Sequence, residues 1–197
     1  MKNIIKNYET PNSNFVVVSP QFSEEELQKI IDYCETKDTQ TGLIGNNITD
    51  HQVRNSNISW ISKNRDSGWF FERLVQIVSK VNYENFQFDL TGFDLLQYTK
   101  YEKDQLYNWH QDIALGYPEN NLHRKLSFSL ILNSVEKDYS GGEFGIVNTG
   151  DIHKTETIPL AKGQIIFFPS FVSHKVYPVS TGTRRSLVGW VIGPKFK

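Results

Sequence analysis

The chain has 197 residues, of which 38% are hydrophobic and 22% charged, enough for one well-filled hydrophobic core and short for two. An aromatic content of 13% excludes a largely disordered or low-complexity chain. Lys and Arg number 21 against 22 Asp and Glu, so the chain lacks the bulk positive charge that holds nucleic acid or anionic membranes. We therefore expect a single globular domain with no nucleic-acid partner.

Cysteine content and hydropathy indicate the cellular compartment in which the protein is expected. Cys34 is the only cysteine, which excludes an internal disulfide and a cysteine-based zinc cluster. No apolar run has the length of a signal-peptide core or a membrane span. We expect a soluble, cytoplasmic protein without a membrane partner. Its oligomeric state stays open, because exposed sheet edges can be covered by a helix or by a second chain.

Two amphipathic helices are expected in the first half. Ser23 and Glu26 form a capping-box pattern, followed at helical spacing by Leu27, Ile30, Ile31 and Cys34. A second helix should begin near Asp66 or Ser67 and run to Asn82, with Phe70, Leu74, Ile77, Val78 and Val81 on one face. Between the two helices, residues 37–53 read as a polar loop.

After residue 85 the pattern changes to short runs of β-branched and aromatic residues, broken by Gly, Pro, Asn and Asp. The expected strands span residues 86–99, 106–112, 125–132, 142–147, 155–159, 164–168, 175–176 and 184–192. Many short strands without alternating helices favour an antiparallel sandwich or barrel. The sequence thus predicts a mainly β fold, with helices packed on a jelly-roll-like core.

The chemistry-bearing residues lie in this β half. His110 and Asp112 are two positions apart on an expected strand, so both side chains point to one face. His174 follows the apolar strand 164–168 and its Pro-containing turn. Two imidazoles and one carboxylate on one side of a metal leave other coordination positions open, which suits Fe(II) with a chelating co-substrate and O2 better than zinc.

Several ordered motifs extend this pattern. His-x-Asp at 110–112 is followed by Gly-Gly-Glu at 141–143, by Gly-x-Ile-Ile-Phe-Phe-Pro-Ser at 163–170, by His174, and by Pro-Val, Gly and Arg ending at Arg184. This order resembles the Fe(II)- and 2-oxoglutarate-dependent dioxygenases, in particular the prolyl 4-hydroxylase-like, PKHD-type branch, over about residues 93–190. The resemblance implies one domain over 1–197, with a helical part (about 20–82) and a double-stranded β-helix core, jelly-roll and cupin-like (about 86–193).

The resemblance also implies roles for individual residues. His110, Asp112 and His174 match the metal ligands at the catalytic centre. Arg184 matches the basic residue that pairs with the distal carboxylate of 2-oxoglutarate, a task that suits a guanidinium because its planar fork binds carboxylates bidentately. Strand alternation places Ser186 on the face of Arg184. A register slip of one residue would present Arg185 instead.

Aromatic residues near the motifs complete the expected site. Tyr98 resembles the family's tyrosine on the strand leading to His-x-Asp, which donates to the co-substrate carboxylate; its alternative role is core packing. By parity, Tyr107 and Trp109 should face away from the metal pocket. Trp190 shares the parity of Arg184, although core packing is favoured for it. Arg54 is a candidate for the pocket rim, without an assigned role.

The activity implied by the resemblance is hydroxylation of an unactivated C–H bond, with release of succinate and CO2. The cofactors would be Fe(II), 2-oxoglutarate and O2, with ascorbate as a candidate reductant. The first hypothesis is a prolyl (peptidyl) hydroxylase, and the long loop 37–53 mildly favours a peptide substrate. The alternatives are a hydroxylase of a free amino acid or other small molecule, and a non-catalytic metal-binding jelly-roll module that recognises a ligand.

Overall fold

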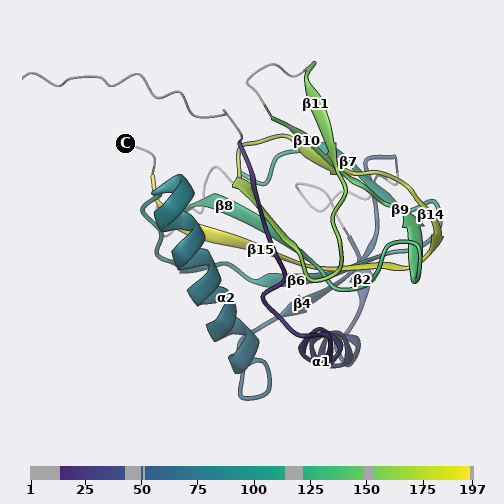
Figure 1. Cartoon of the computed structure of the whole chain (residues 1–197), viewed down its shortest axis with the longest axis horizontal. Coiled ribbons are helices and arrows are strands. Elements are labelled where there is room, and N and C mark those ends of the chain that lie inside the picture. The colour runs from purple at the N-terminus through teal and green to yellow at the C-terminus, as the bar shows by residue number, and fades with distance from the viewer. Residues whose placement is uncertain (1–13, 43–49, 51, 114–121, 149–152, 196–197) are drawn as a thin grey trace, which may run out of the picture.

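A computed structural model describes residues 14–42, 50, 52–113, 122–148 and 153–195 (Figure 1). The loop expected at 37–53 therefore lies partly outside the described residues, and so does the N-terminal segment. Within the described ranges the elements are β1 Val16–Val18, α1 Glu24–Glu35, β2 Gln40–Thr41, β3 Arg54–Asn55, β4 Asn57–Ile61, α2 Gly68–Val81, a π-helical turn η2 Asn82–Phe86, β5 Gly92–Phe93, β6 Leu96–Tyr101, β7 Leu106–His110, β8 Leu122–Ile131, β9 Tyr139–Gly141, β10 Phe144–Val147, β11 Thr155–Ile158, β12 Ile165–Pro169, β13 His174–Val176, β14 Val179–Gly182 and β15 Arg184–Pro194.

Two antiparallel sheets face each other. Among the described residues, the major sheet runs in the order β1-β12-β8-β15-β6-β4-β2, with β5 added beside β15, and the minor sheet in the order β11-β10-β13-β7-β3. Strands β9 and β14 form a separate two-stranded sheet. The prediction of a mainly β chain with flanking helices is confirmed. Strands β1 to β4 were not predicted, and through them the N-terminal part contributes strands to both sheets.

The helices cover one face of the major sheet (Figure 1). The capping box of α1 is present as predicted: Glu26 N–H donates to Ser23 Oγ at 3.2 Å, and Ser23 N–H donates to Glu26 at 2.8 Å. Helix α2 begins at Gly68, close to the predicted start. Apolar residues of both helices pack against one face of β6, β8, β12 and β15 in a single buried cluster: Leu27, Ile30, Phe70, Leu74, Leu96, Tyr98, Leu130, Phe167 and Leu187.

The opposite face of the major sheet meets the minor sheet. A second apolar cluster fills part of the space between them, including Tyr101, Ile131, Phe144, Phe168 and Val176. Adjacent positions on β6 and β15 therefore belong to different layers: one side chain faces the helices and the next faces the space between the sheets. That alternation decides which residues can reach a site between the sheets.

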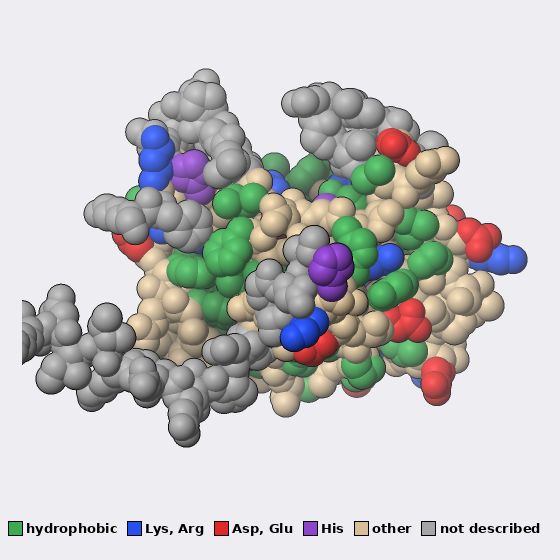
Figure 2. Space-filling view, turned by 90° about the horizontal axis from the view of Figure 1, so that it is seen from above, with side chains coloured by type: hydrophobic (Ala, Val, Ile, Leu, Met, Phe, Trp, Pro, Cys, Tyr) green, Lys and Arg blue, Asp and Glu red, His purple; other side chains and the backbone are tan. Residues whose placement is uncertain are grey.

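The surface agrees with the near-neutral composition. On the face drawn in Figure 2, acidic and basic side chains lie dispersed among apolar and polar ones rather than gathered into a basic patch. Within the described ranges, none of the helices combines the length and the apolar character that crossing a membrane would require.

Candidate metal and co-substrate site

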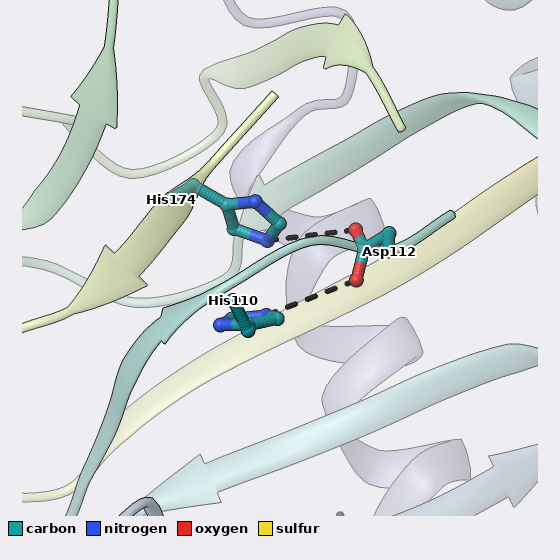
Figure 3. A group of neighbouring side chains, drawn as sticks. All are labelled: His110, Asp112 and His174. Atoms are coloured by element: carbon teal, nitrogen blue, oxygen red, sulfur yellow. Dashed lines mark ion pairs between the residues drawn. The ribbon is translucent and has the colours of Figure 1, made fainter. Parts of the chain in front are cut away.

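The three residues expected to bind a metal come together between the sheets. His110 ends β7, Asp112 lies two residues beyond it, and His174 begins β13, the strand paired with β7 (Figure 3). His110 Nε2 lies 3.8 Å from Asp112 Oδ1, and His174 Nε2 lies 3.5 Å from Asp112 Oδ2. One ligand atom from each residue lies within 4.8 Å of the other two. This is the spacing of a facial set around one ion.

Both imidazoles are oriented by the backbone. His110 Nδ1 lies 2.8 Å from the carbonyl oxygen of Asn108, and His174 Nδ1 lies 3.0 Å from that of Val172. A carbonyl can only accept, so each Nδ1 carries the proton and each Nε2 presents its lone pair toward Asp112. Hydrogen bonds of this kind fix the tautomer of metal-binding histidines.

The electrostatics also suit a cation. Burial disfavours the imidazolium form of His110 and, together with the nearby His174, lowers its pKa to about 3. Burial would raise the pKa of Asp112, but the adjacent His174 and His110, together with side-chain hydrogen bonding, outweigh burial and hold that pKa below its usual range. At neutral pH, His110 therefore offers a lone pair and Asp112 a full carboxylate charge.

One atom of the set has no hydrogen-bonding role in the described structure. Asp112 Oδ2 is buried and accepts no hydrogen bond from the described residues. A buried carboxylate oxygen is costly to leave unsatisfied. Coordination of a divalent cation would satisfy it, so the residues present fit the metal that the donor set implies.

Arg184 and Ser186, on the inner face of β15, line the same cavity as His110, Asp112 and His174. Arg184 is 2% exposed, and its Nη1 donates to Ser186 Oγ at 3.1 Å, while its Nε has no partner among the described residues. Arg185 points to the helical layer, where its Nε donates to Glu35 at 3.3 Å. The structure thus brings Arg184, and not Arg185, to the cavity.

The expectation for Tyr98 is corrected. Its side chain lies in the helical layer, and its hydroxyl donates to Glu35 at 2.7 Å, outside the cavity lining. The reason is register: Tyr98 pairs with Leu187 on β15, whereas Tyr101 pairs with Arg184. Tyr101 is 4% exposed, lines the cavity, and its ring lies 5.7 Å from Arg184 Cζ. Burial raises the pKa of Tyr101, so its hydroxyl stays a proton donor.

The expectation for Tyr107 is also wrong. Tyr107 lines the cavity and stacks on His110, with ring centroids 3.4 Å apart and planes 11° apart. Strand alternation fails here because the β7–β13 pairing shifts register: His110 pairs with His174, and Tyr107 pairs with Val176. Three residues of β7 therefore span two of β13, as in a β-bulge, which places both rings on one face. Trp109 is 38% exposed and lies outside the cavity, as predicted.

Trp190 and Arg54 also line the cavity. Trp190 borders the cavity, contrary to the core packing that was favoured, and its buried Nε1 has no hydrogen-bond partner among the described residues. Arg54, on β3, is buried; its Nη2 donates to Gln97 at 2.7 Å and its Nε to Ser56 at 3.1 Å. The place of Arg54 in the cavity follows from strand pairing, because β3 lies beside β7 in the minor sheet.

Comparison with known proteins identifies the segment that carries this site. Residues 96–192 match the family described as the 2OG-Fe(II) oxygenase superfamily. A PKHD-type hydroxylase of Crocosphaera subtropica is 38% identical over 97 residues, and one of Acaryochloris marina is 36% identical over 96 residues. Each match covers 49% of this chain and 41% of the relative, so the chain spans about two-fifths of the length of these relatives.

Solved structures share the fold over most of the chain. A Pseudomonas putida prolyl-4-hydroxylase superposes with a TM-score of 0.72 at 17% identity, covering 93% of this chain and 94% of that one. A Trichoplax adhaerens prolyl hydroxylase, solved with a hypoxia inducible factor peptide fragment, gives a TM-score of 0.73 at 18% identity, covering 91% and 83%. The predicted jelly-roll, double-stranded β-helix core is confirmed.

Proposed function

We propose that this chain, whose residues 96–192 match the 2OG-Fe(II) oxygenase superfamily, is an Fe(II)- and 2-oxoglutarate-dependent hydroxylase acting on peptidyl proline. The observation that carries the proposal is the convergence of His110, Asp112 and His174, with ligand atoms within 4.8 Å of one another, in a cavity that also holds Arg184. A protein that only bound a metal would have no evident need for a buried, partly unsatisfied guanidinium beside it.

In this proposal His110, Asp112 and His174 would hold Fe(II), and a set of two imidazoles and one carboxylate suits a metal that also takes a chelating co-substrate and O2. Bound iron supplies the redox chemistry that converts 2-oxoglutarate and O2 to succinate and CO2 while a substrate C–H bond is hydroxylated. The chain itself positions the reactants. Arg184 pairs with the distal carboxylate of the co-substrate, because its Nε has no partner among the described residues and can donate to that carboxylate.

Neighbouring polar groups complete the proposed co-substrate cradle. Ser186 holds the Arg184 guanidinium in place through its Oγ, and its hydroxyl can donate to the same carboxylate. Tyr101, opposite Arg184 on the adjacent strand, takes the role that the sequence assigned to Tyr98. The apolar walls Phe144 and Phe168, together with Val176, exclude water from the metal side of the cavity.

A peptide substrate is favoured by the structural neighbours. The Pseudomonas putida and Trichoplax adhaerens proteins are both described as prolyl hydroxylases, and the second was solved with a peptide fragment. Their identity to this chain is 17–18%, so they support the fold and suggest the substrate class. We further propose that the helical part and the jelly-roll core act as one domain, supported by β3 pairing with β7 and β4 pairing with β6.

The test is turnover of 2-oxoglutarate and mass analysis of peptides. Purified protein with Fe(II) should convert 2-oxoglutarate to succinate under air, and a proline-containing peptide library should show products heavier by one oxygen atom. The same peptides with proline replaced by alanine should stay unmodified. Succinate formation stimulated by free amino acids, without any peptide product, would contradict the peptidyl substrate and favour a small-molecule hydroxylase.

A further inference from the structure

The rings of Tyr107 and His110 form a stack that regular strand geometry would forbid. Residues three apart on a strand normally point to opposite faces. Here the register shift between β7 and β13 brings both to the inner face, with centroids 3.4 Å apart and planes only 11° apart. Bulges beside active sites commonly re-aim a side chain. The irregularity in β7 thus places an aromatic face directly against an imidazole whose Nε2 points at Asp112.

A buried cation packs against the tyrosine of this stack. Arg54 pairs with Tyr107 across β3 and β7, so both side chains share a face, and Arg54 Cζ lies 4.5 Å from the Tyr107 ring centroid. The guanidinium is itself fixed by hydrogen bonds to Ser56 and Gln97. Attraction between a cation and an aromatic face strengthens in a desolvated site. Arg54 therefore packs against the same Tyr107 ring that stacks on His110.

The two histidines of the site are held differently. His174 is flanked by apolar rings: the Phe144 ring lies nearly parallel to it at 5.6 Å, and the Phe168 ring lies tilted at 4.4 Å. Its side chain is 6% exposed, compared with 13% for His110. The Asn108 carbonyl anchors His110 at Nδ1 only, and a single hydrogen bond does not fix the plane of a ring. Two rings restrain that plane: His174 lies tilted at 4.1 Å, and Tyr107 lies stacked and nearly parallel at 3.4 Å. The broad parallel contact comes from Tyr107.

We propose that Tyr107, backed by Arg54, is a positioning residue that sets the metal affinity of the site by holding His110 in its coordinating orientation. This inference rests on the proposed function, because it requires that His110 bind a metal. The face of the Tyr107 ring carries the effect, and its hydroxyl is dispensable. Neither residue touches the metal; both act through the imidazole, as outer residues of metal sites commonly do.

The experiment measures metal affinity rather than turnover. Metal-free protein is titrated with Co(II) in the presence of a competing chelator, and binding is followed by the visible Co(II) absorption bands. Tyr107→Leu removes the ring and should weaken Co(II) binding by about 10- to 100-fold, the usual loss when an outer-shell partner is removed. Tyr107→Phe keeps the ring and should restore wild-type affinity. Arg54→Met should cause a smaller loss than Tyr107→Leu.

Trp109→Leu is the matched control, because Trp109 lies on the same strand but on its exposed side. It should leave Co(II) affinity unchanged. Thermal unfolding of the metal-free variants separates positioning from packing: a purely structural role for Tyr107 would lower the melting temperature without altering affinity.

The outcomes distinguish the inference from the proposed function. If the wild type binds Co(II) and Tyr107→Leu binds it within twofold, the positioning role is overturned while the metal site stands. An affinity of Arg54→Met equal to that of the wild type would overturn the part assigned to Arg54. If the folded wild type fails to bind Co(II), the proposed metal chemistry is refuted, and the inference that depends on it falls as well.

Discussion

Gly142 connects the Gly-Gly-Glu motif to the proposed co-substrate arginine. It adopts a φ of +66°, and a Cβ added there would lie 2.9 Å from Arg184 Cδ and 3.0 Å from Val179 Cγ2. Carbon atoms pack best at about 3.5–4.0 Å. Gly142→Ala must therefore push the Arg184 side chain away by roughly 0.5–1 Å. Because Ser186 fixes the far end of the guanidinium, this displacement disturbs its alignment with a bound carboxylate.

Two effects of Gly142→Ala should be measurable. The left-handed backbone costs about 1–2 kcal/mol for a residue with a Cβ, and each kcal/mol lowers the melting temperature of a chain of this size by about 2–4 °C. Misplacing a positioning group by about 1 Å can lower the reaction rate by as much as 100-fold. We expect the Kd for 2-oxoglutarate, measured by anaerobic titration of the Fe(II)-loaded protein, to rise about 10- to 100-fold.

Gly141→Ala is the matched control. Gly141 has a φ of +75°, and an added Cβ would meet the backbone of Pro178 and Ser180 rather than Arg184. It should lose thermal stability while keeping 2-oxoglutarate affinity near that of the wild type. If Gly142→Ala unfolds earlier but binds 2-oxoglutarate as well as Gly141→Ala does, then the crowding of Arg184 has no bearing on the co-substrate, and our reasoning is refuted.

Three further predictions follow from side-chain placement. Arg184→Met should weaken 2-oxoglutarate binding by about 2 kcal/mol or more, whereas Arg185→Met should not; the reverse result in an anaerobic titration would show that the register is misassigned. Tyr101→Phe should raise the Kd for 2-oxoglutarate, while Tyr98→Phe should lower only the melting temperature. Burial lowers the pKa of His110 to about 3 in the folded protein. As the pH falls below 6.5, this imidazole therefore takes up a proton in the unfolded chain before it does so in the folded protein. The unfolding free energy of the metal-free protein should therefore drop from pH 7 to 4, and less so in His110→Gln, as urea titrations would show.

Local patterns predicted the features that depend on a single element. The capping box at Ser23 requires only four neighbouring residues, and its geometry is as predicted. Alternation along one strand correctly separates Arg184 from Arg185, because β15 runs without a bulge at that point. The ordered motifs from His-x-Asp to Arg184 likewise identified the residues that the structure brings together.

Features that depend on pairing between distant segments could not be predicted in this way. The choice between Tyr98 and Tyr101 requires the register of β6 against β15, which are more than 80 residues apart. The position of Tyr107 depends on a register shift in β7 that no local residue pattern indicates. Arg54 reaches the cavity because the two-residue strand β3 pairs with β7, and so short a strand carries no periodic signal.

A chelated iron site is the central requirement of the proposed function. Metal-free protein would be titrated anaerobically with Fe(II) and then with 2-oxoglutarate, and the weak visible charge-transfer band of the chelate would be recorded for the wild type and for Asp112→Ala. We predict a band in the wild type that is absent from the variant, because Asp112 supplies the only carboxylate of the described metal set. A folded, iron-loaded wild type that shows no band with 2-oxoglutarate would contradict the proposed dioxygenase chemistry and favour a metal-binding module without turnover.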